Sequence, residues 1–284
     1  MFKASIQNAN SDVLQLTGDE NAYQIVSIEG LNPPQALINT TPIVGMDGAL
    51  FNSSKLETRN LVITVRINGN VEKNRLRLYS LFRTKEGCRF FYSNDSLDVS
   101  IDGYVESVAC GLFSNNETAQ ISIICPRPYF RAISAVVSDV SHTLGLFVFP
   151  FSIEVDEPIP FSDYSASRVS DVANGSQSST GVAIRIVFTS SATMVKIQNV
   201  TTGETMQLDY AFQADDVVDI STYQGQKSIT LTRAGAVSNL FSALQAGSTF
   251  FQLQPGSNYF SFVTDGDDET IGITFTHYDE YRGV

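Results

Sequence analysis

The chain has 284 residues and a net charge of −12; 43% of its residues are hydrophobic and only 17% are charged. This length allows one large β domain or two ordinary domains, and the apolar fraction is sufficient for real cores. The charged share is below the usual ~25%, and polar uncharged residues replace it, which favours β-rich structure over a helical bundle.

The acidic excess is concentrated in the second half of the chain. Residues 1–131 carry 12 Lys and Arg against 13 Asp and Glu, whereas residues 132–284 carry 6 against 17. An acidic surface repels the phosphates of nucleic acids. We therefore expect no sequence-specific nucleic-acid binding, and the nearly neutral first half can meet partners of either sign.

The cysteines Cys88, Cys110 and Cys125 are odd in number and widely spaced. This pattern fits neither a disulfide framework nor a zinc site, so we predict buried free thiols from a reducing compartment. The N-terminus has no apolar signal core, and the longest apolar run, Leu144–Phe151, is too short to span a bilayer. We expect no membrane insertion and synthesis in a cytoplasm.

Short strands are predicted over residues 13–28, before Gly30–Pro34 breaks the pattern. The stretch that follows, Asn32–Lys55, is long and poorly periodic, and we predict a loop. Loops of this length inside a domain are usually functional or held by a neighbour.

The clearest strand of the first half is Asn60–Gly69, with Leu61, Ile63, Val65 and Ile67 on one face. A helix is predicted over residues 72–86, with Gly87 as its stop. Its apolar stripe is Leu78, Leu81 and Phe82. Strands follow at 89–92, 97–107 and 119–125, so this half is predicted to be one helix packed on a β-sheet.

Much of the positive charge of the first half surrounds this helix. The residues are Lys73, Arg75, Arg77, Arg83 and Lys85. One interpretation is a solvated helix face, and the other is a face that meets an acidic neighbour.

A seam between two domains is predicted at the end of the strand Ile121–Cys125. Proline cannot donate a hydrogen bond to a sheet ladder, so two prolines separated by one residue end the strand. Two large aromatic residues follow them. The seam residues are Pro126, Pro128, Tyr129 and Phe130. We predict an N-terminal β domain over 1–131, a linker over 132–142 and a second domain over 143–284.

The second half has short alternating strands separated by turn residues, which is typical of an antiparallel sandwich. Met194–Leu208 is predicted to be a hairpin around a turn at Thr201–Glu204. The other predicted strands are 147–155, 182–189, 226–233, 250–253, 258–264 and 270–278. Residues 165–181 are predicted to be a loop.

No arrangement of residues typical of catalysis is found. The chain has two histidines, His142 and His277, and no phosphate loop, nucleophile elbow or paired-histidine metal helix. His277 shares strand parity with apolar residues and is predicted to be packed. The acidic turn Asp265–Glu269 offers oxygen ligands for calcium, but its spacing is not that of an EF-hand loop and a solvated turn is the better explanation. We expect no catalytic residue, cofactor or metal, and hence a structural or binding protein and not an enzyme.

Several motifs resemble the distal tail protein (Dit) family of siphophages, the long-tailed, non-contractile bacteriophages. In the first half they are Tyr23–Pro34, Asp47–Gly48, Arg59–Gly69 and Cys125–Phe130. In the second half they are Thr180–Gly181, Ile197–Glu204, Asp219–Gly225, Leu253–Phe260 and Tyr281–Val284. Each is weak alone, but their order and spacing make the resemblance specific over most of the chain, and residues 133–165 match less well.

The resemblance implies that six copies form a ring at the tail tip. The first domain would make the ring around a central channel, and the second, a galectin-like β-sandwich, would project outward. The implied partners are the same chain, the tail tube protein, the tail-associated hub or fibre protein and a receptor-binding protein. It also implies a place in the virion after assembly in the bacterial host cytoplasm.

Basic residues of the first half are candidates for ring or tube contacts. They are Arg59, Arg66, Arg75, Arg77 and Arg83. The alternative function is a virion-borne carbohydrate-binding adhesion module that uses the second sandwich. The chain has no Trp, although sugar faces commonly stack on one.

Overall fold

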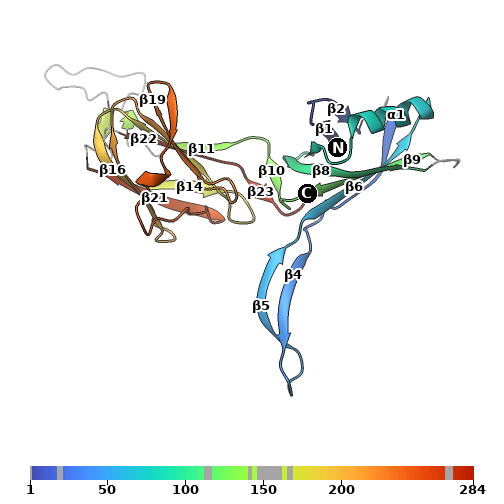
Figure 1. Cartoon of the computed structure of the whole chain (residues 1–284), viewed down its shortest axis with the longest axis horizontal. Helices are drawn as coiled ribbons and strands as arrows, with labels where there is room; N and C mark the ends of the chain where they lie inside the picture. The colour runs from blue at the N-terminus through green and yellow to red at the C-terminus, as the bar shows by residue number, and fades with distance from the viewer. Residues whose placement is uncertain are drawn as a thin grey trace, which may run out of the picture. The chain divides into compact units, whose positions relative to one another are not determined.

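The structure is a computed structural model of the chain (Figure 1) and describes residues 2–17, 22–111, 117–139, 143–145, 162–164, 169–265 and 271–284. The chain divides into two compact units. The first unit is Met1–Ser134 together with Glu280–Val284, and the second unit is Ala135–Asp279. The described residues are mainly β, with multiple antiparallel sheets and one α-helix, as predicted.

The first unit is built on one antiparallel sheet with the strand order β2-β1-β7-β8-β9-β6-β3, to which β10 and β23 are added at β8. The strands are β1 (Lys3–Asn8), β2 (Val13–Gln15), β3 (Tyr23–Glu29), β6 (Arg59–Ile67), β7 (Gly87–Ser93), β8 (Asp98–Cys110), β9 (Thr118–Cys125), β10 (Phe130–Ala132) and β23 (Glu280–Tyr281).

Strand β6 alternates as the sequence predicts, because Leu61, Ile63, Val65 and Ile67 are all buried. The helix α1 (Val71–Leu81) covers this face of the sheet and contributes the buried Leu78 to the same core (Figure 1). Its first turn is capped by Asn70, whose side chain accepts a hydrogen bond from the Lys73 backbone N–H at 3.1 Å.

The helix ends earlier than the predicted residue 86. Its last backbone bond runs from the N–H of Phe82 to the carbonyl of Leu78. Phe82 is buried, and Lys85 takes a positive φ of 73°. That conformation lies outside the helical region, so the chain turns toward β7 before Gly87.

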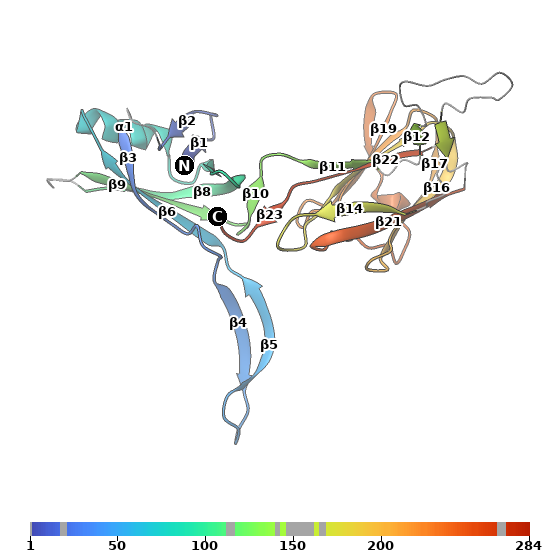
Figure 2. The same cartoon turned by 180° about the vertical axis from the view of Figure 1, so that it is seen from behind.

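The predicted loop over Asn32–Lys55 was wrong, because most of it is a β-hairpin. Strands β4 (Ala36–Pro42) and β5 (Ala49–Leu56) pair with each other from Ala36 opposite Leu56 to Pro42 opposite Ala49. They form a two-stranded sheet of their own that extends away from the main sheet of the first unit (Figures 1 and 2). We call β4 and β5 with their connecting turn the projecting hairpin.

The second unit is an antiparallel sandwich of two sheets around one apolar core. One sheet has the order β11-β22-β15-β18-β19-β20, the other β14-β21-β16-β17, and β12 pairs with β13 alone. The strands are β11 (Val136–Asp139), β12 (Thr143–Gly145), β13 (Ser162–Tyr164), β14 (Ser170–Asn174), β15 (Ala183–Phe188), β16 (Ala192–Asn199), β17 (Thr205–Phe212), β18 (Val217–Ser221), β19 (Ser228–Arg233), β20 (Ala236–Asn239), β21 (Gly256–Thr264) and β22 (Ile271–His277). A single 3-10 turn, η1 (Phe241–Ala243), precedes β21.

The predicted hairpin around Thr201–Glu204 is confirmed as β16 and β17. Two other predictions for this region were wrong: part of the predicted loop 165–181 is β14, which pairs with β21, and part of the predicted linker 132–142 is β11, which pairs with β22. In both cases the partner strand lies far away in sequence, so local composition did not reveal the pairing. The predicted strand 147–155 lies outside the described residues.

The predicted second domain of 143–284 placed the last residues of the chain in the sandwich. In the structure they belong to the first unit instead. Strand β23 pairs with β10, with Phe130 opposite Tyr281 and Arg131 opposite Glu280 (Figure 2). We call Glu280–Val284 the return segment, because it brings the chain back into the first unit after β22.

Candidate interaction surface

The projecting hairpin exposes nearly all of its side chains. Every residue of β4 is exposed, and in β5 only Leu56 is half-buried. The large apolar side chains exposed here are Leu37, Ile38, Val44, Met46, Leu50 and Phe51. Phe51 is 65% exposed and Val44 wholly so. The gathering of so many exposed apolar side chains on one element favours a site of interaction.

Both faces of the hairpin carry apolar side chains among polar ones. Leu37 and Ile38 are adjacent in β4 and so point to opposite faces, as Leu50 and Phe51 do in β5. No core lies under either face, and the hairpin depends on its backbone ladder and on side-chain bonds such as Asn39 to Ser53 at 2.9 Å. A two-stranded hairpin of this kind is marginal alone, so we expect neighbouring molecules to cover it.

Sequence analysis missed these apolar residues, although a signal for them is present. Gly45 and Gly48 flank the tip and both take positive φ values, 83° and 89°. Glycines favour such turns between strands. The apolar residues on either side of the turn do not alternate with polar ones because neither face is buried, which concealed the strands.

The five candidate arginines do not form one surface. Arg66 is exposed on β6, on the face opposite the buried residues that contact α1. Arg75 and Arg77 lie on α1, and Arg83 follows it. Arg59 is the exception, because it is only 3% exposed.

Arg59 therefore does not belong among the interface candidates. Its Nε donates to the carbonyl of Pro128 at 2.9 Å and its Nη1 to that of Asn32 at 2.7 Å. The guanidinium also donates to the carbonyls of Gly30 and Arg282, and its Cζ lies 4.6 Å from the centre of the Phe130 ring. Burial lowers the pKa of Arg59. This side chain is an internal connection and not a contact site.

The outer face of α1 combines basic and apolar groups. Leu76 and Tyr79, three residues apart, are exposed. Arg75 is held by both carboxylate oxygens of Glu72 at 2.7 Å, whereas Arg77 forms no ion pair with any described residue. The helix thus presents an amphipathic surface of positive charge, in keeping with the second interpretation of its basic residues.

The seam residues lie inside the first unit and do not mark its exit. Phe130 is fully buried in β10, which also pairs with β8 through Arg131 opposite Ser100. Pro128 supplies a carbonyl to Arg59, Tyr129 is half-buried and Pro126 is exposed. The chain passes into the second unit only after Ser134.

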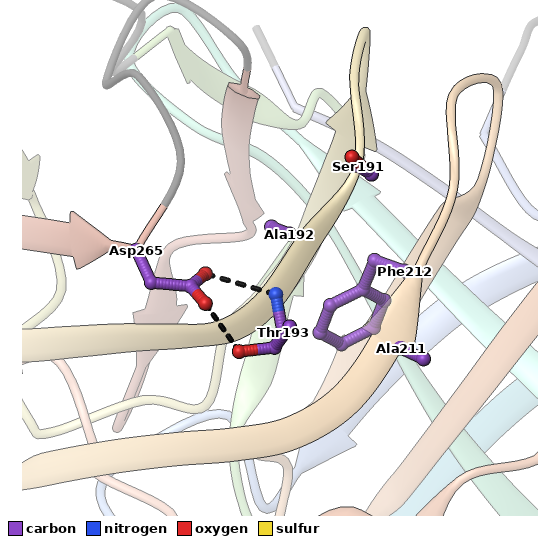
Figure 3. A pocket seen from close by; sticks show the side chains of 6 residues that line it. All are labelled: Ser191, Ala192, Thr193, Ala211, Phe212 and Asp265. Carbon is purple, nitrogen blue, oxygen red and sulfur yellow. Dashed lines mark hydrogen bonds between the residues drawn. The ribbon is translucent and has the colours of Figure 1, made fainter.

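The sandwich has a small pocket of about 220 Å³ near the start of β16 (Figure 3). It is lined by Ser191, Ala192, Thr193, Ala211, Phe212 and Asp265. The Asp265 carboxylate accepts the backbone N–H groups of Thr193 at 2.9 Å and Met194 at 3.1 Å, and also the Thr193 hydroxyl.

These bonds, first of all the one from the Thr193 hydroxyl, lower the pKa of Asp265. They satisfy backbone N–H groups at the register shift of β16 between Ala192 and Met194. The carboxylate is therefore occupied by its own chain, and the pocket gives no specific support to sugar or calcium binding. The rest of the predicted acidic turn, Asp267–Glu269, lies outside the described residues.

Other candidate groups are packed and not poised for chemistry. His277 is fully buried, as predicted, and burial lowers its pKa; His142 lies outside the described residues. Cys88 and Cys125 are buried free thiols whose pKa burial raises to about 12, and Cys110 is a half-buried free thiol.

Within the described ranges, no cluster of three His, Cys, Asp or Glu residues is arranged to hold a metal ion. Among the helices that the structure describes, none has the length and apolar character needed to cross a membrane.

Two family models match the chain. A phage tail protein RIFT-related domain matches residues 15–125, and the C-terminal domain of a siphovirus-type tail component matches residues 175–278. No curated protein matches the chain.

Solved structures share the fold. The crystal structure of the phage SPP1 Dit protein, described as a hub of the adsorption apparatus, superposes with a TM-score of 0.69 at 16% identity, over 97% of this chain and 98% of that one. A chain of the phage P2 baseplate in its activated conformation with Ca superposes with a TM-score of 0.52 at 10% identity, over 98% of both chains.

Proposed function

The chain belongs to the distal tail protein family of siphophages, and we propose that six copies of it assemble head to tail into a ring at the tail tip. Family membership makes it a structural protein of the phage tail or baseplate. The proposed ring joins the tail tube to the tail-associated hub or fibre protein and carries a receptor-binding protein. Its role is structural and not enzymatic, and assembly takes place in the host cytoplasm.

The projecting hairpin is the observation that carries the proposal. A closed ring of identical copies needs a heterologous interface, in which one surface of each copy meets a different surface of the next. The hairpin supplies one such surface, because it carries large apolar side chains on both faces and is uncovered in the single chain. Covering Ile38, Leu50 and Phe51 with a neighbouring copy would remove apolar area from water, at about 25 cal/mol per Å².

The outer face of α1 is the second contact surface in this proposal. Its exposed Leu76 and Tyr79 supply apolar area, and Arg77 supplies uncompensated positive charge. An acidic surface on an adjacent copy or on the tail tube would complement it. The acidic second half of the chain is a source of such charge within the same ring.

Light scattering of the purified protein across concentration tests the ring. The expected mass is six times 31.0 kDa, with ring-shaped particles by negative-stain microscopy. The double variant Ile38→Ser/Phe51→Ser should shift the equilibrium toward monomer without loss of fold, because both side chains are exposed in the single chain.

Val237→Ser is the matched control, since Val237 is a similarly exposed residue, in β20 of the second unit. Loss of assembly in the control, or an unchanged mass in the hairpin variant, would argue against the hairpin as the ring contact.

A further inference from the structure

We propose that Arg59 is a positioning residue for the projecting hairpin, and that it acts by fastening the return segment to the hairpin root. We define the hairpin root as residues 30–35 and 57–58, which join β4 and β5 to the main sheet. The consequence for assembly rests on the ring function proposed above, whereas the positioning itself does not.

Arg59 bonds to three separate segments of the first unit. It donates to the carbonyls of Gly30 and Asn32 in the hairpin root, to that of Pro128 before β10, and to that of Arg282 in the return segment. All four acceptors are backbone carbonyls, so the guanidinium fixes the course of the chain at each point. Only arginine has a fork of donors that can reach so many acceptors at once.

The return segment also contacts the hairpin root directly. The backbone N–H of Val284 donates to the carbonyl of Leu31 at 3.1 Å. Gly283 lies so close to the root that a Cβ there would come within 2.9 Å of Pro33 Cδ and 3.0 Å of the Leu31 carbonyl oxygen. These contacts hold Leu31–Pro33 against the return segment.

Apart from Leu31, which packs against the core, the described residues give the hairpin few other supports at its base. Beyond its own ladder, one backbone bond, from the N–H of Glu57 to the carbonyl of Gln35, closes the root. Gly30 takes a φ of 87° with its α-carbon against the Asn60 carbonyl, where a Cβ would come within 2.2 Å. The direction in which the hairpin leaves the sheet is therefore set by this turn and by the Arg59 contacts.

The arrangement makes the hairpin depend on the far end of the chain. The buried guanidinium has no carboxylate partner in its hydrogen bonds, so each lost carbonyl leaves a buried charge less solvated. Without the return segment, Arg59 loses the Arg282 carbonyl and Leu31 loses its donor. In sequence, the return segment follows β22 after only Tyr278 and Asp279. The hairpin reaches its ring-competent position only when the whole chain has folded.

Hydrogen exchange of the full chain, followed by mass spectrometry under dilute conditions, tests the positioning role. In Arg59→Lys, the ammonium has only three donors on one nitrogen and no planar fork, so the four carbonyls cannot all keep their bonds. In Gly283→Ala, the new methyl pushes the return segment from the root while the Arg59 side chain stays intact. Both variants should speed exchange in peptides covering residues 30–36 and 55–59 by about tenfold or more, since a bond to a charged group contributes more than the 1.4 kcal/mol that corresponds to tenfold. Exchange in β15 and β16 should stay unchanged.

Arg89→Lys is the matched control, because Arg89 is an exposed arginine in an ion pair with Asp102. The proposal would be overturned if, in either variant, the root peptides stayed as protected as in the unaltered protein. It would also be overturned if exchange became faster evenly throughout β6–β9. The exchange result does not depend on assembly. If the unaltered protein never forms a ring, the proposed function fails while the positioning role is still decided.

Discussion

Arg127 and Glu280 form an ion pair at 2.8 Å although 153 positions separate them in the sequence. Glu280 is nearly fully buried, whereas Arg127 is half exposed. The pair joins the residue that follows Pro126 to the first residue of the return segment, and so supplements the pairing of β10 with β23. Burial raises the pKa of Glu280 by more than Arg127 and Arg131 lower it.

Arg127→Ala should therefore destabilise the first unit, and increasingly so at higher pH. A carboxyl with a raised pKa in the folded state contributes most below its ordinary pKa and loses that contribution as pH rises through the folded value. Removing Arg127 raises the pKa of Glu280 further, because the carboxylate loses the nearest positive charge that favours its ionised form. We expect a loss of about 2 kcal/mol at neutral pH and less near pH 5, by urea unfolding followed by circular dichroism.

The double variant Arg127→Ala/Glu280→Gln is the control for that prediction. Glutamine does not ionise, so the additional loss at high pH should disappear. An equal loss for Arg127→Ala at both pH values would show that the effect comes from packing and not from charge.

Reversing Arg75, Arg77 and Arg83 to Glu should weaken the ring, because the outer face of α1 would become acidic. The mass of the variant by light scattering, with helix content checked by circular dichroism, is the measurement. Lys196→Glu/Lys227→Glu in the second unit adds negative charge elsewhere and should leave the assembly nearly unchanged. An unaltered oligomer in the α1 variant would remove the helix from the ring contact.

Gly103→Ala should destabilise the first unit by about 1–3 kcal/mol, because the added methyl has no room. A Cβ on Gly103 would lie 2.5 Å from Ile123 Cγ2 and 2.9 Å from Cys125 Sγ, both in the buried core. Gly87→Ala is the matched control, since nothing lies within 4 Å of the position that its Cβ would occupy. Similar unfolding midpoints for the two variants would contradict the prediction.

The stability that Asp216 gives to the second unit should be lost in acid. Its side chain is nearly fully buried against Arg233, and hydrogen bonds from that residue lower its pKa. A lowered pKa gives stability that is present above the ordinary carboxyl pKa and is lost as pH falls through the folded value. Asp216→Asn should lower the thermal midpoint at neutral pH, and the difference from the unaltered protein should shrink as pH falls below about 4.

Asp219→Asn provides the comparison for Asp216. Asp219 pairs with Arg185 across two strands, and both side chains are well exposed. Exposed pairs contribute little, so this variant should change the midpoint less than Asp216→Asn at every pH. The reverse order would contradict the role given to the Asp216–Arg233 pair.

The sequence by itself determined those elements whose burial repeats along a short stretch. In β6, Leu61, Ile63 and Val65 alternate with half-buried or exposed residues, and the structure confirms this face as core. The β16–β17 hairpin is confirmed for the same reason, with turn residues between two alternating strands. Local periodicity reports burial directly, so the fold class followed from it, whereas the family resemblance rested on short motifs and their order along the chain.

Only the tertiary structure decided the projecting hairpin and the return segment. Leu37, Ile38 and Phe51 show no alternation, because both faces of the hairpin are exposed in the single chain and no burial imposes a period of two. Arg59 was predicted to be a candidate ring or tube contact, and charged side chains are indeed mostly exposed. It is buried because carbonyls from three distant segments, Arg282 among them, converge on it. Such convergence depends on which strands pair across the whole chain, and local sequence carries no record of that pairing.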